Sequence, residues 1–358
     1  MLHRVELPVI VNARFLTQPV TGVQRFAIEI SLHLKRLLPN VVFVSPQEVL
    51  NKDIAKILEV VKIGKVTGHA WEQAELPLYL RKQGSPLLIN LCNTAPLLYK
   101  NKVVCIHDLA FLVNPQWFSR MFSQLYKVLI PRVVKSSRKI LTVSEFSKGS
   151  IKSILHVPDS DIEVIYNAVS ENIFNSLEKK INNYGDYILA VGSLDPRKNL
   201  KRLILAFNSC KLKETKLVIV GAASKVFKDE ELQQLVQENR SIILTGYLTD
   251  EELKNAYQHA KIFIYPSLFE GFGLPPLEAM HCGCATVVSN TTSLPEVCAD
   301  ASLYVNPNSV EELANRMSLL IENESLRSSL IMKGFERSKH FSWEKSSKRL
   351  VQVIESLR

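Results

Sequence analysis

Short apolar runs alternate with helix-like patterns twice along the chain, and this alternation restricts the fold more than any other feature. In the second series the short runs are fully apolar and bounded by Gly or Ser, as in parallel strands covered on both faces. The first series comprises VELPVIVNARF, VVFVS, PLLINL, KVVCIHD and RKILTVS, and the second comprises DYILAVGS, TKLVIVG, SIILTG, KIFIYPS and ATVVSN. The pattern predicts an α/β protein with two doubly wound, Rossmann-like parallel sheets.

The length of the chain supports two domains. At about 150 residues per domain, 358 residues suit two domains that each have a core. A polar, turn-rich segment separates the two series of strands, so we place the linker near 168–184. Two such domains facing each other would leave a cleft between the carboxyl ends of their sheets, where ligands of these folds bind.

Composition excludes several classes of protein. Hydrophobic residues make up 46% of the chain and charged residues 22%, which is not the composition of a disordered protein. The chain has no secretory h-region near its start and no apolar stretch of about 18 residues, so we expect a cytosolic location. Six cysteines without CxxC pairs indicate buried, reduced thiols rather than metal ligands.

A net charge of +9 suits an anionic partner without naming it. The segment 117–139 concentrates this charge, with six Lys and Arg residues among apolar ones at near-helical spacing. Two interpretations stay open for it: a surface helix that covers a core, or an amphipathic helix on the inner face of the cytoplasmic membrane.

The stretch EGFGLPPLE, residues 270–278, follows a strand and predicts a phosphate-binding turn. Gly271 and Gly273 allow close approach of the backbone, and the two prolines suit a first helical turn. Backbone N–H groups at such a helix start bind anions. Glu278, placed in the first turn, could bind vicinal hydroxyls, and Glu270 lies at the strand end. The alternative is that the two carboxylates only complement the helix dipole and cap a turn.

A second strand, glycine turn and helix start occurs in LAVGSLDPRKNL, residues 189–200. Arg197 and Lys198 open this predicted helix, where cations oppose the dipole. Two cations at a helix start suit a pyrophosphate between them, although solvated surface charges are the alternative.

The first half contributes weaker candidates. His107, at the carboxyl end of a strand, could donate to a sugar hydroxyl or could be a core histidine. Gly22 begins a helix and could approach a phosphate. No GxGxxG follows a strand and no GxxxxGK[ST] occurs, so nicotinamide and P-loop sites are unsupported. Asp159 and Asp161 fit a polar turn better than a metal site, so we expect a site that needs no metal and no other cofactor.

The motifs EGFGLPPLEAMHCG, VGSLDPRKN, CIHDLAFL, ILTVSEFSK and SNTTSLPEVCADASLYVNP occur in this order. With them, nearly the whole chain resembles the retaining glycosyltransferases of family 4, which have the GT-B fold. It resembles most the bacterial mannosyltransferase-like enzymes that build O-antigen and other surface polysaccharides. The resemblance implies an acceptor-binding domain at 1–172, joined by a crossing helix at 342–358, and a donor-binding domain at 173–341.

The resemblance assigns roles in the donor-binding domain. Glu270 matches the first glutamate of the family's pair, beside the anomeric carbon of the donor sugar, and Glu278 matches the second, which binds the ribose. Phe272, Gly273 and Leu274 would present backbone amides to the donor.

The remaining matches concern the phosphates, the sugar and the base. Arg197 and Lys198 match the cations that hold the pyrophosphate. Many family members carry arginine directly after the equivalent of Gly192, whereas this chain has Ser193, which leaves more of the phosphate charge to those two cations. The other matched residues are His107 near the donor sugar, Gly22 facing the phosphates, and Tyr247 and Leu248 near the base.

The implied activity is transfer of a hexose, with retention, from a nucleotide diphosphate sugar to a growing, lipid-linked surface polysaccharide. GDP-mannose is the first choice of donor, and dTDP-rhamnose, UDP-glucose and UDP-N-acetylhexosamines stay open. A sugar-nucleotide epimerase or a phosphorylase would share the fold. A basic nucleic-acid-binding module is a further alternative, but no aromatic stacking surface accompanies the charge, so we expect no nucleic-acid partner.

Overall fold

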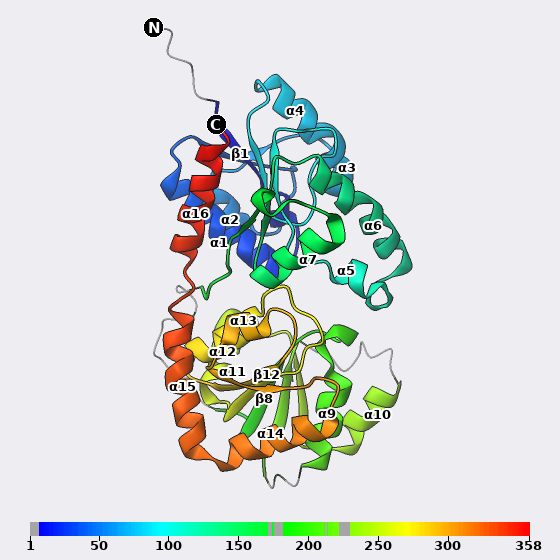
Figure 1. Cartoon of the computed structure of the whole chain (residues 1–358), viewed down its shortest axis with the longest axis vertical. Coiled ribbons are helices and arrows are strands. Elements are labelled where there is room, and N and C mark those ends of the chain that lie inside the picture. Colours follow the sequence, from blue (N-terminus) through cyan, green and yellow to red (C-terminus); the bar gives the residue numbers. More distant parts are fainter. Residues whose placement is uncertain (1–6, 171–173, 175–181, 211, 213, 222–229) are drawn as a thin grey trace. The chain divides into compact units, whose positions relative to one another are not determined.

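The computed structural model describes residues 7–170, 174, 182–210, 212, 214–221 and 230–358. The chain divides into two compact units (Figure 1). Unit 1 runs to Asn167 and also contains Ser342–Arg358, and unit 2 is Ala168–Phe341. The predicted linker, 168–184, contains 171–173 and 175–181, which lie outside the described residues.

Unit 1 is built on a parallel sheet whose described strands have the order β3-β2-β1-β4-β5-β6-β7. The strands are β1 (Val9–Asn12), β2 (Val41–Ser45), β3 (Val61–Lys62), β4 (Leu88–Asn90), β5 (Lys102–Cys105), β6 (Lys139–Thr142) and β7 (Ile162–Val164). The strand order reverses between β1 and β4. Ligands of doubly wound folds bind at this switch point, outside the carboxyl ends of the strands.

The helices of unit 1 are α1 (Gly22–Leu37), α2 (Lys52–Ile57), α3 (Gly68–Ala70), α4 (Leu76–Lys82), α5 (Ala110–Val113), α6 (Arg120–Lys135), α7 (Glu145–Leu155) and α16 (Trp343–Ser356). The end of the chain belongs to this unit, because α16 lies beside α1 (Figure 1). Trp343 meets Phe26 of α1 edge to face, with ring centroids 5.9 Å apart. The Ser346 hydroxyl donates to the Tyr166 carbonyl over 2.7 Å.

Unit 2 repeats the same topology. Its parallel sheet has the described order β10-β9-β8-β11-β12-β13, with the reversal between β8 and β11. The strands are β8 (Tyr187–Val191), β9 (Lys216–Val220), β10 (Ile242–Gly246), β11 (Ile262–Tyr265), β12 (Ala285–Ser289) and β13 (Ser302–Val305). The helices are α9 (Leu200–Ser209), α10 (Glu230–Glu238), α11 (Asp250–His259), α12 (Leu274–His281), α13 (Leu294–Cys298), α14 (Val310–Glu322) and α15 (Glu324–Ser338).

The apolar runs form the strands because both faces of each sheet are covered. All four residues of β11 are buried, and Ile262 and Ile264 pack in one core with residues of β8, α9 and α14. Burying such a side chain contributes roughly 1.5–3 kcal/mol relative to leaving it exposed. The predicted α/β fold with two doubly wound parallel sheets is confirmed.

Helix α6 is shorter than the basic segment that was predicted as helical. It spans Arg120–Lys135, with Pro131 inside it, and Lys139 already begins β6. Its buried face carries Leu129, Ile130, Val133 and Val134, which pack in the core of unit 1. The interpretation of this helix as a cover of the core is therefore confirmed for one of its faces.

Three other features follow the sequence analysis or qualify it. Asp159 and Asp161 lie in a 3-10 turn before β7, as predicted, where Lys148 pairs with Asp159 at 2.9 Å. All six cysteines are free thiols, three of them buried and three half-buried. In the described part of the chain no helix is long and apolar enough to span a bilayer.

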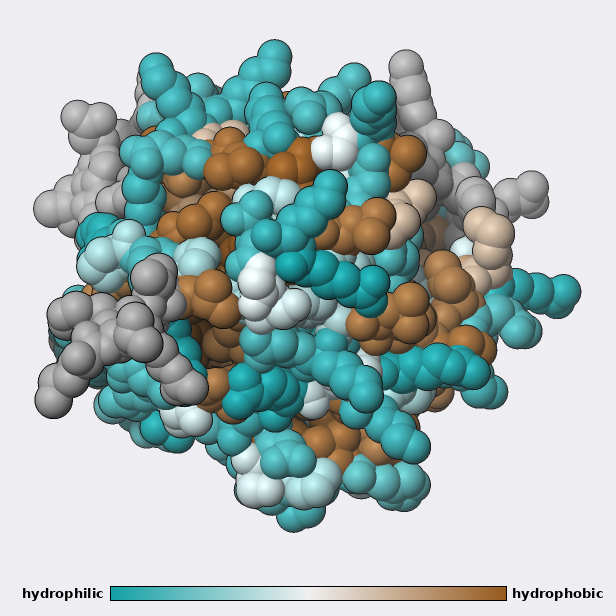
Figure 2. All heavy atoms as spheres, turned by 90° about the horizontal axis from the view of Figure 1, so that it is seen from above, coloured by the Kyte–Doolittle hydropathy of each residue, from teal (hydrophilic) through white to brown (hydrophobic). Residues whose placement is uncertain are grey.

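Figure 2 shows one face of the molecule, where apolar side chains lie at the surface in separate patches among hydrophilic ones.

A buried lysine joins β5 to the end of α6. The side chain of Lys102 is fully buried, and its ammonium donates to the Tyr99 carbonyl at 2.7 Å and to the Ser136 carbonyl and hydroxyl at 3.2 and 2.7 Å. These acceptors satisfy its three N–H groups but carry no full negative charge. Burial lowers the pKa of Lys102 from 10.5 to about 8.

This lowered pKa makes the contribution of Lys102 to stability depend on pH. Between pH 8 and 10.5 the unfolded chain keeps the Lys102 proton that the folded chain releases, so rising pH removes the penalty of burying the charge. We expect the stability of the wild type relative to Lys102→Met to rise across this window, by up to about 1.4 kcal/mol per pH unit. Urea unfolding at pH 7.5, 8.5 and 9.5 measures it. Lys100→Met, at an exposed neighbour, is the control, and an equal difference at all three pH values would contradict the assignment.

Candidate functional site

The loop between β11 and α12 approaches its neighbours so closely that it needs glycine. Gly273, the residue before α12, has φ +104°, and a Cβ atom there would lie 2.6 Å from Leu294 Cδ2. Pro275 and Pro276 have no N–H, so this end of α12 leaves only the amides of Gly273 and Leu274 without an intrahelical acceptor. Those two amides point out of the helix start, where an anion would bind.

Glu270 is buried at the start of this loop, with 8% of its surface exposed. Its Oε1 accepts hydrogen bonds from the Lys198 ammonium at 2.6 Å and from the hydroxyls of Tyr265, at 3.0 Å, and Ser267. Burial alone would raise the pKa of Glu270, but the charges of Lys198 and Arg197 and the hydrogen bonds outweigh it and lower the pKa. Glu270 is therefore an ionised carboxylate at neutral pH.

Lys198 lies at the carboxyl end of β8 and meets Glu270 across the switch point of the sheet. Its ammonium also donates to the Tyr265 hydroxyl at 2.6 Å and lies 4.9 Å from the centre of that ring. Gly192 makes room for its stem, since a Cβ at Gly192 would lie 3.0 Å from Lys198 Cγ. The lysine is thus held by an acid, a hydroxyl and an aromatic face.

Arg197 ties the two loops together through its backbone. Its carbonyl accepts from the Leu268 amide at 2.8 Å and from the Ser267 hydroxyl at 3.1 Å. The prediction that Arg197 and Lys198 open α9 is wrong by one turn. They lie in the 3-10 turn Pro196–Lys198, and Asn199, with φ +59°, separates this turn from α9. Proline at 196 and the left-handed residue after the turn account for the break.

Glu278 lies just past the first turn of α12, in which it was predicted. The helix begins at Leu274, so Glu278 is its fifth residue and cannot complement the helix start. Its side chain is buried, and Oε2 accepts from the Tyr257 hydroxyl at 3.1 Å. Burial first, and the Glu278 charge second, raise the pKa of Tyr257 well above its usual value, so Tyr257 remains a hydrogen-bond donor.

The sequence analysis missed the residues that hold the loop in place. The Ser293 hydroxyl, before α13, bridges the carbonyls of Glu270 and Phe272 at 3.0 and 2.7 Å. The Glu270 amide donates to the Thr292 hydroxyl at 3.3 Å. Tyr265, which bonds to Lys198 and Glu270, and Ser267, which bonds to Glu270, were missed as well. The polar run SNTTS directly after a strand was the one signal for Thr292 and Ser293.

Of the other predicted residues of unit 2, Tyr247 and Leu248 lie at the same edge of the sheet but apart from this cluster. Tyr247, 85% exposed, and the half-buried Leu248 follow β10, which β9 and β8 separate from β11. Ser193 is exposed beside Gly192. The Phe272 ring packs edge to face on Phe341, with centroids 5.4 Å apart.

The two predicted residues of unit 1 are placed as follows. His107 follows β5 and is 6% exposed, and its Nε2–H donates to the Leu91 carbonyl at 2.8 Å. Burial is the main cause that lowers the pKa of His107, so the ring is neutral near pH 7. Gly22 is the first residue of α1, with open space around its Cα. Their roles toward a ligand stay predictions.

In chemical terms, the cluster in unit 2 can bind an anion next to a hydroxyl group. Two cations and two outward-pointing amides attract negative charge, while the ionised Glu270 accepts hydrogen bonds from hydroxyls. No three His, Cys, Asp or Glu side chains gather as metal ligands in the part of the chain that the structure describes.

Removing the Ser293 hydroxyl should loosen the loop. Ser293→Ala removes the one O–H that the two carbonyls share, and the loss of a buried donor of this kind costs about 1–3 kcal/mol. We expect faster hydrogen exchange at the amides of 270–274 and a lower melting temperature. Ser209→Ala is the matched control, because Ser209 is exposed and its hydroxyl only returns to its own helix. Unchanged exchange at 270–274 would exclude the bridging role.

Comparisons with known proteins add a family to this geometry. Residues 172–337 match the family model described as "Glycosyl transferases group 1". The O-antigen chain mannosyltransferase B of Escherichia coli is 31% identical over 268 residues, which are 71% of this chain and 70% of that protein. The serotype-specific mannosyltransferase WbdA of Escherichia coli is also 31% identical, over 68% of this chain but only 32% of its own length.

A solved structure matches the chain nearly from end to end. The crystal structure of HepE (Alr3699) from Anabaena, in complex with UDP and glucose, superposes with a TM-score of 0.75. The match covers 98% of this chain and 100% of the other, at 16% sequence identity. At this identity the likeness shows the fold alone.

Proposed function

The chain belongs to the group 1 glycosyltransferases, with the GT-B fold, and on this premise we propose that it transfers mannose from GDP-mannose to a lipid-linked surface polysaccharide. We propose further that the transfer retains the anomeric configuration and needs no divalent ion. The choice of sugar rests on the two relatives named as mannosyltransferases. The observation that carries the proposal is the Lys198–Glu270 pair, with side chains 14% and 10% exposed, at the switch point of unit 2 beside the amides of α12.

The proposed mechanism is electrostatic. As the glycosidic bond stretches, negative charge develops on the departing diphosphate, and positive charge develops on the sugar. Lys198, Arg197 and the amides of Gly273 and Leu274 stabilise the diphosphate. They are already held in place by the loop contacts, so little reorganisation is needed during the reaction. Glu270 accepts a hydroxyl of the donor sugar, and Glu278, further along α12, accepts the ribose hydroxyls.

The exchange of partners at Lys198 is central to this mechanism. In the structure Glu270 Oε1 accepts from the Lys198 ammonium at 2.6 Å. A diphosphate beside Lys198 would compete for the same N–H groups, and the Tyr265 hydroxyl, bonded to both side chains, would keep the pair aligned while the charge is shared. We therefore assign Tyr265 as a positioning residue for Lys198 and Glu270.

A nucleotide panel followed by a transfer assay tests the function. We expect GDP to raise the melting temperature more than UDP or dTDP, because a ligand that binds the folded state stabilises it. Transfer from GDP-mannose to a lipid-linked saccharide extract should give an α-linked product by NMR and should persist in EDTA. If UDP or dTDP raises the melting temperature and GDP does not, the donor is a UDP- or dTDP-sugar and not GDP-mannose. If none of the three nucleotides raises it, the proposal is contradicted.

Lys198→Met tests whether the Lys198 ammonium stabilises the departing diphosphate. Loss of one group that stabilises developing charge lowers kcat by about 100- to 1,000-fold. Glu270 then keeps its hydrogen bonds from Tyr265 and Ser267 but loses its ion-pair partner, so the variant also loses stability, by at most about 3–5 kcal/mol. Lys198→Met/Glu270→Gln restores part of that stability without restoring turnover. Lys201→Met, which removes an exposed lysine of α9, is the control and should turn over like the wild type. Near-normal kcat for Lys198→Met would refute the leaving-group role.

We also propose that unit 1 docks on an anionic membrane through α6. The outward side chains Met121, Leu125 and Val128 are 83%, 49% and 53% exposed and repeat at helical spacing. The cations Arg120, Lys127, Arg132 and Lys135 are exposed along the same helix, and the helix carries no acidic residue. An apolar stripe between cations suits insertion at the boundary of lipid headgroups and acyl chains. A lipid-linked acceptor would be found on such a surface.

Vesicle sedimentation tests the docking of α6. Lys127→Gln/Arg132→Gln/Lys135→Gln should bind vesicles with 30% anionic lipid at least ten-fold more weakly, at about 1 kcal/mol per cation near the surface. The matched control, Lys56→Gln/Lys65→Gln/Lys100→Gln, removes the same charge from exposed sites of unit 1 outside α6. Equal losses in both triple variants would show attraction by net charge alone, and intact binding in the α6 variant would exclude the docking.

A further inference from the structure

A buried tyrosine of α11 bonds to the carboxylate of α12 that the proposed mechanism uses. Tyr257 is fully buried, and its hydroxyl donates to Glu278 Oε2 over 3.1 Å. Phe263 of β11 meets the tyrosine ring edge to face, with centroids 5.4 Å apart, and the Phe174 ring lies 6.4 Å from it on a tilted plane. Because the ring is enclosed, its hydroxyl has one fixed direction, and a buried tyrosine hydroxyl needs a partner. The contact therefore holds one oxygen of Glu278 in place.

A second buried tyrosine beside α11 makes a different kind of bond. Tyr187, in β8, is 1% exposed, and its hydroxyl donates to the Ala256 carbonyl at 2.6 Å. That bond joins a strand to the backbone of α11, which already has a fixed direction. Tyr257 instead bonds to a carboxylate, whose terminal torsion is broad unless a partner fixes it. Glu278 keeps 7% of its surface exposed, so a ligand can reach the group that Tyr257 orients.

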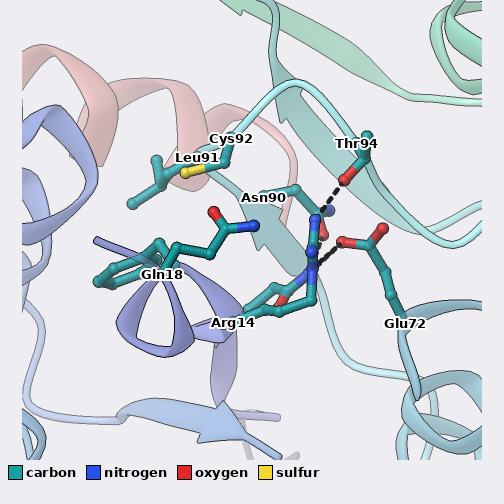
Figure 3. Close-up of a pocket in the computed structure, with 9 residues that line it drawn as sticks. Arg14, Gln18, Glu72, Asn90, Leu91, Cys92 and Thr94 are labelled. Carbon is teal, nitrogen blue, oxygen red and sulfur yellow. Dashed lines mark hydrogen bonds and ion pairs between the residues drawn. The ribbon is translucent and has the colours of Figure 1, made fainter. Parts of the chain in front are cut away.

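The tyrosine orients Glu278 without cancelling its charge. A buried carboxylate of unit 1 illustrates the other arrangement: Glu72 Oε1 accepts from Arg14 at 3.3 Å, and Figure 3 shows the guanidinium beside it. There a cation offsets the negative charge. Tyr257 is a neutral donor, because burial raises its pKa well above the usual value. A carboxylate directed by a neutral hydroxyl stays a strong acceptor, since hydrogen bonds to ionised groups are about twice as strong as neutral ones.

Helix α11 also connects this contact to the segment after β10. Its N-cap, Thr249, accepts from the Glu252 amide at 3.3 Å, and the Glu252 carboxylate accepts from the Thr249 amide at 2.8 Å. Tyr247 and Leu248, predicted near the base, directly precede this cap. A nucleotide carries its ribose between base and phosphates. The Tyr257–Glu278 bond joins the helix that begins at the predicted base segment to the helix that begins at the anion-binding loop.

From this arrangement we infer that Tyr257 is a positioning residue that gives the donor site its preference for ribose over 2′-deoxyribose. The inference rests on the proposed function for the role of Glu278 and adds the group that sets its orientation. A carboxylate offers about four acceptor positions, and Tyr257 takes one of them and so aims the others. A carboxylate aimed in this way accepts two vicinal hydroxyls at once, whereas 2′-deoxyribose offers only one of them.

Tyr257→Phe tests the inference, because it keeps the ring and removes only the hydroxyl. The affinities of GDP, UDP and their 2′-deoxy forms are measured by calorimetry. In the wild type, the ribose form of the bound nucleotide should bind roughly 10- to 100-fold more tightly than its deoxy form, as expected for one hydrogen bond to a charged acceptor. In Tyr257→Phe this ratio should fall at least about three-fold, chiefly because the ribose form binds more weakly.

Tyr187→Phe is the matched control. It also removes a buried hydroxyl that bonds to α11, but it leaves Glu278 with its tyrosine donor. It should lower the melting temperature and keep the wild-type ratio of affinities. In Glu278→Gln, adding Tyr257→Phe should change the ratio no further, because Tyr257 acts through that carboxylate. In turnover, Tyr257→Phe should raise KM for the nucleotide sugar more than it lowers kcat, the pattern of lost ground-state binding.

Three results would overturn the inference alone and leave the proposed function standing. The first is an unchanged ratio in Tyr257→Phe, even if both forms bind more weakly, because loosened packing weakens both equally. The second is an equal fall of the ratio in Tyr187→Phe, and the third is a wild type that binds both forms equally well. A wild type that binds none of the four nucleotides would refute the proposed function and the inference together.

Discussion

The candidate site depends on one buried ion pair, between Lys198 and Glu270. The pair links the segment after β8 to the segment after β11, which are the two strands that flank the reversal of strand order in unit 2. Tyr265, Ser267 and the backbone of Arg197 surround it with hydrogen bonds, so neither charge is buried without partners. A pair of this kind is held ready for a ligand, because any anion that enters finds the cation already desolvated and aligned.

Unit 1 repeats the same principle with different residues. Its buried pair, Arg14 and Glu72, also lies beside a strand-order reversal, and its cation again follows the first strand of its unit. The two sheets share one topology, so the same edge of each can hold an ion pair beside the reversal of strand order. In unit 2 Lys198, Tyr265 and Ser267 all donate to Glu270 Oε1. In unit 1 Glu72 Oε1 accepts from Asn12 and Arg14, and Oε2 lies 3.5 Å from His69 Nδ1.

The fold was predictable because parallel strands covered on both faces read as continuous apolar runs, such as IFIY in β11. Glu270 and Lys198 were also predictable as residues at strand ends, but not their contact, because 72 positions separate them in the chain. Ser293 was missed for a physical reason. A serine before a helix normally caps it, yet this hydroxyl makes no cap and bonds to the loop carbonyls instead. The position of Glu278 within α12 was predicted wrongly, because a pair of prolines does not show whether the helix begins at the first proline or one residue before it.

The last helix, α16, has a consequence for biosynthesis. It packs against α1 in unit 1, although the whole of unit 2 lies between the two in the sequence. A ribosome makes the whole of unit 2 before it makes α16. Domains generally fold as units during synthesis, so the second half can become native while the first still exposes the apolar surface that Trp343 will cover. Completion of the amino-terminal half therefore waits for the synthesis of α16, and a nascent chain stalled before residue 343 should depend on chaperones at the face of α1.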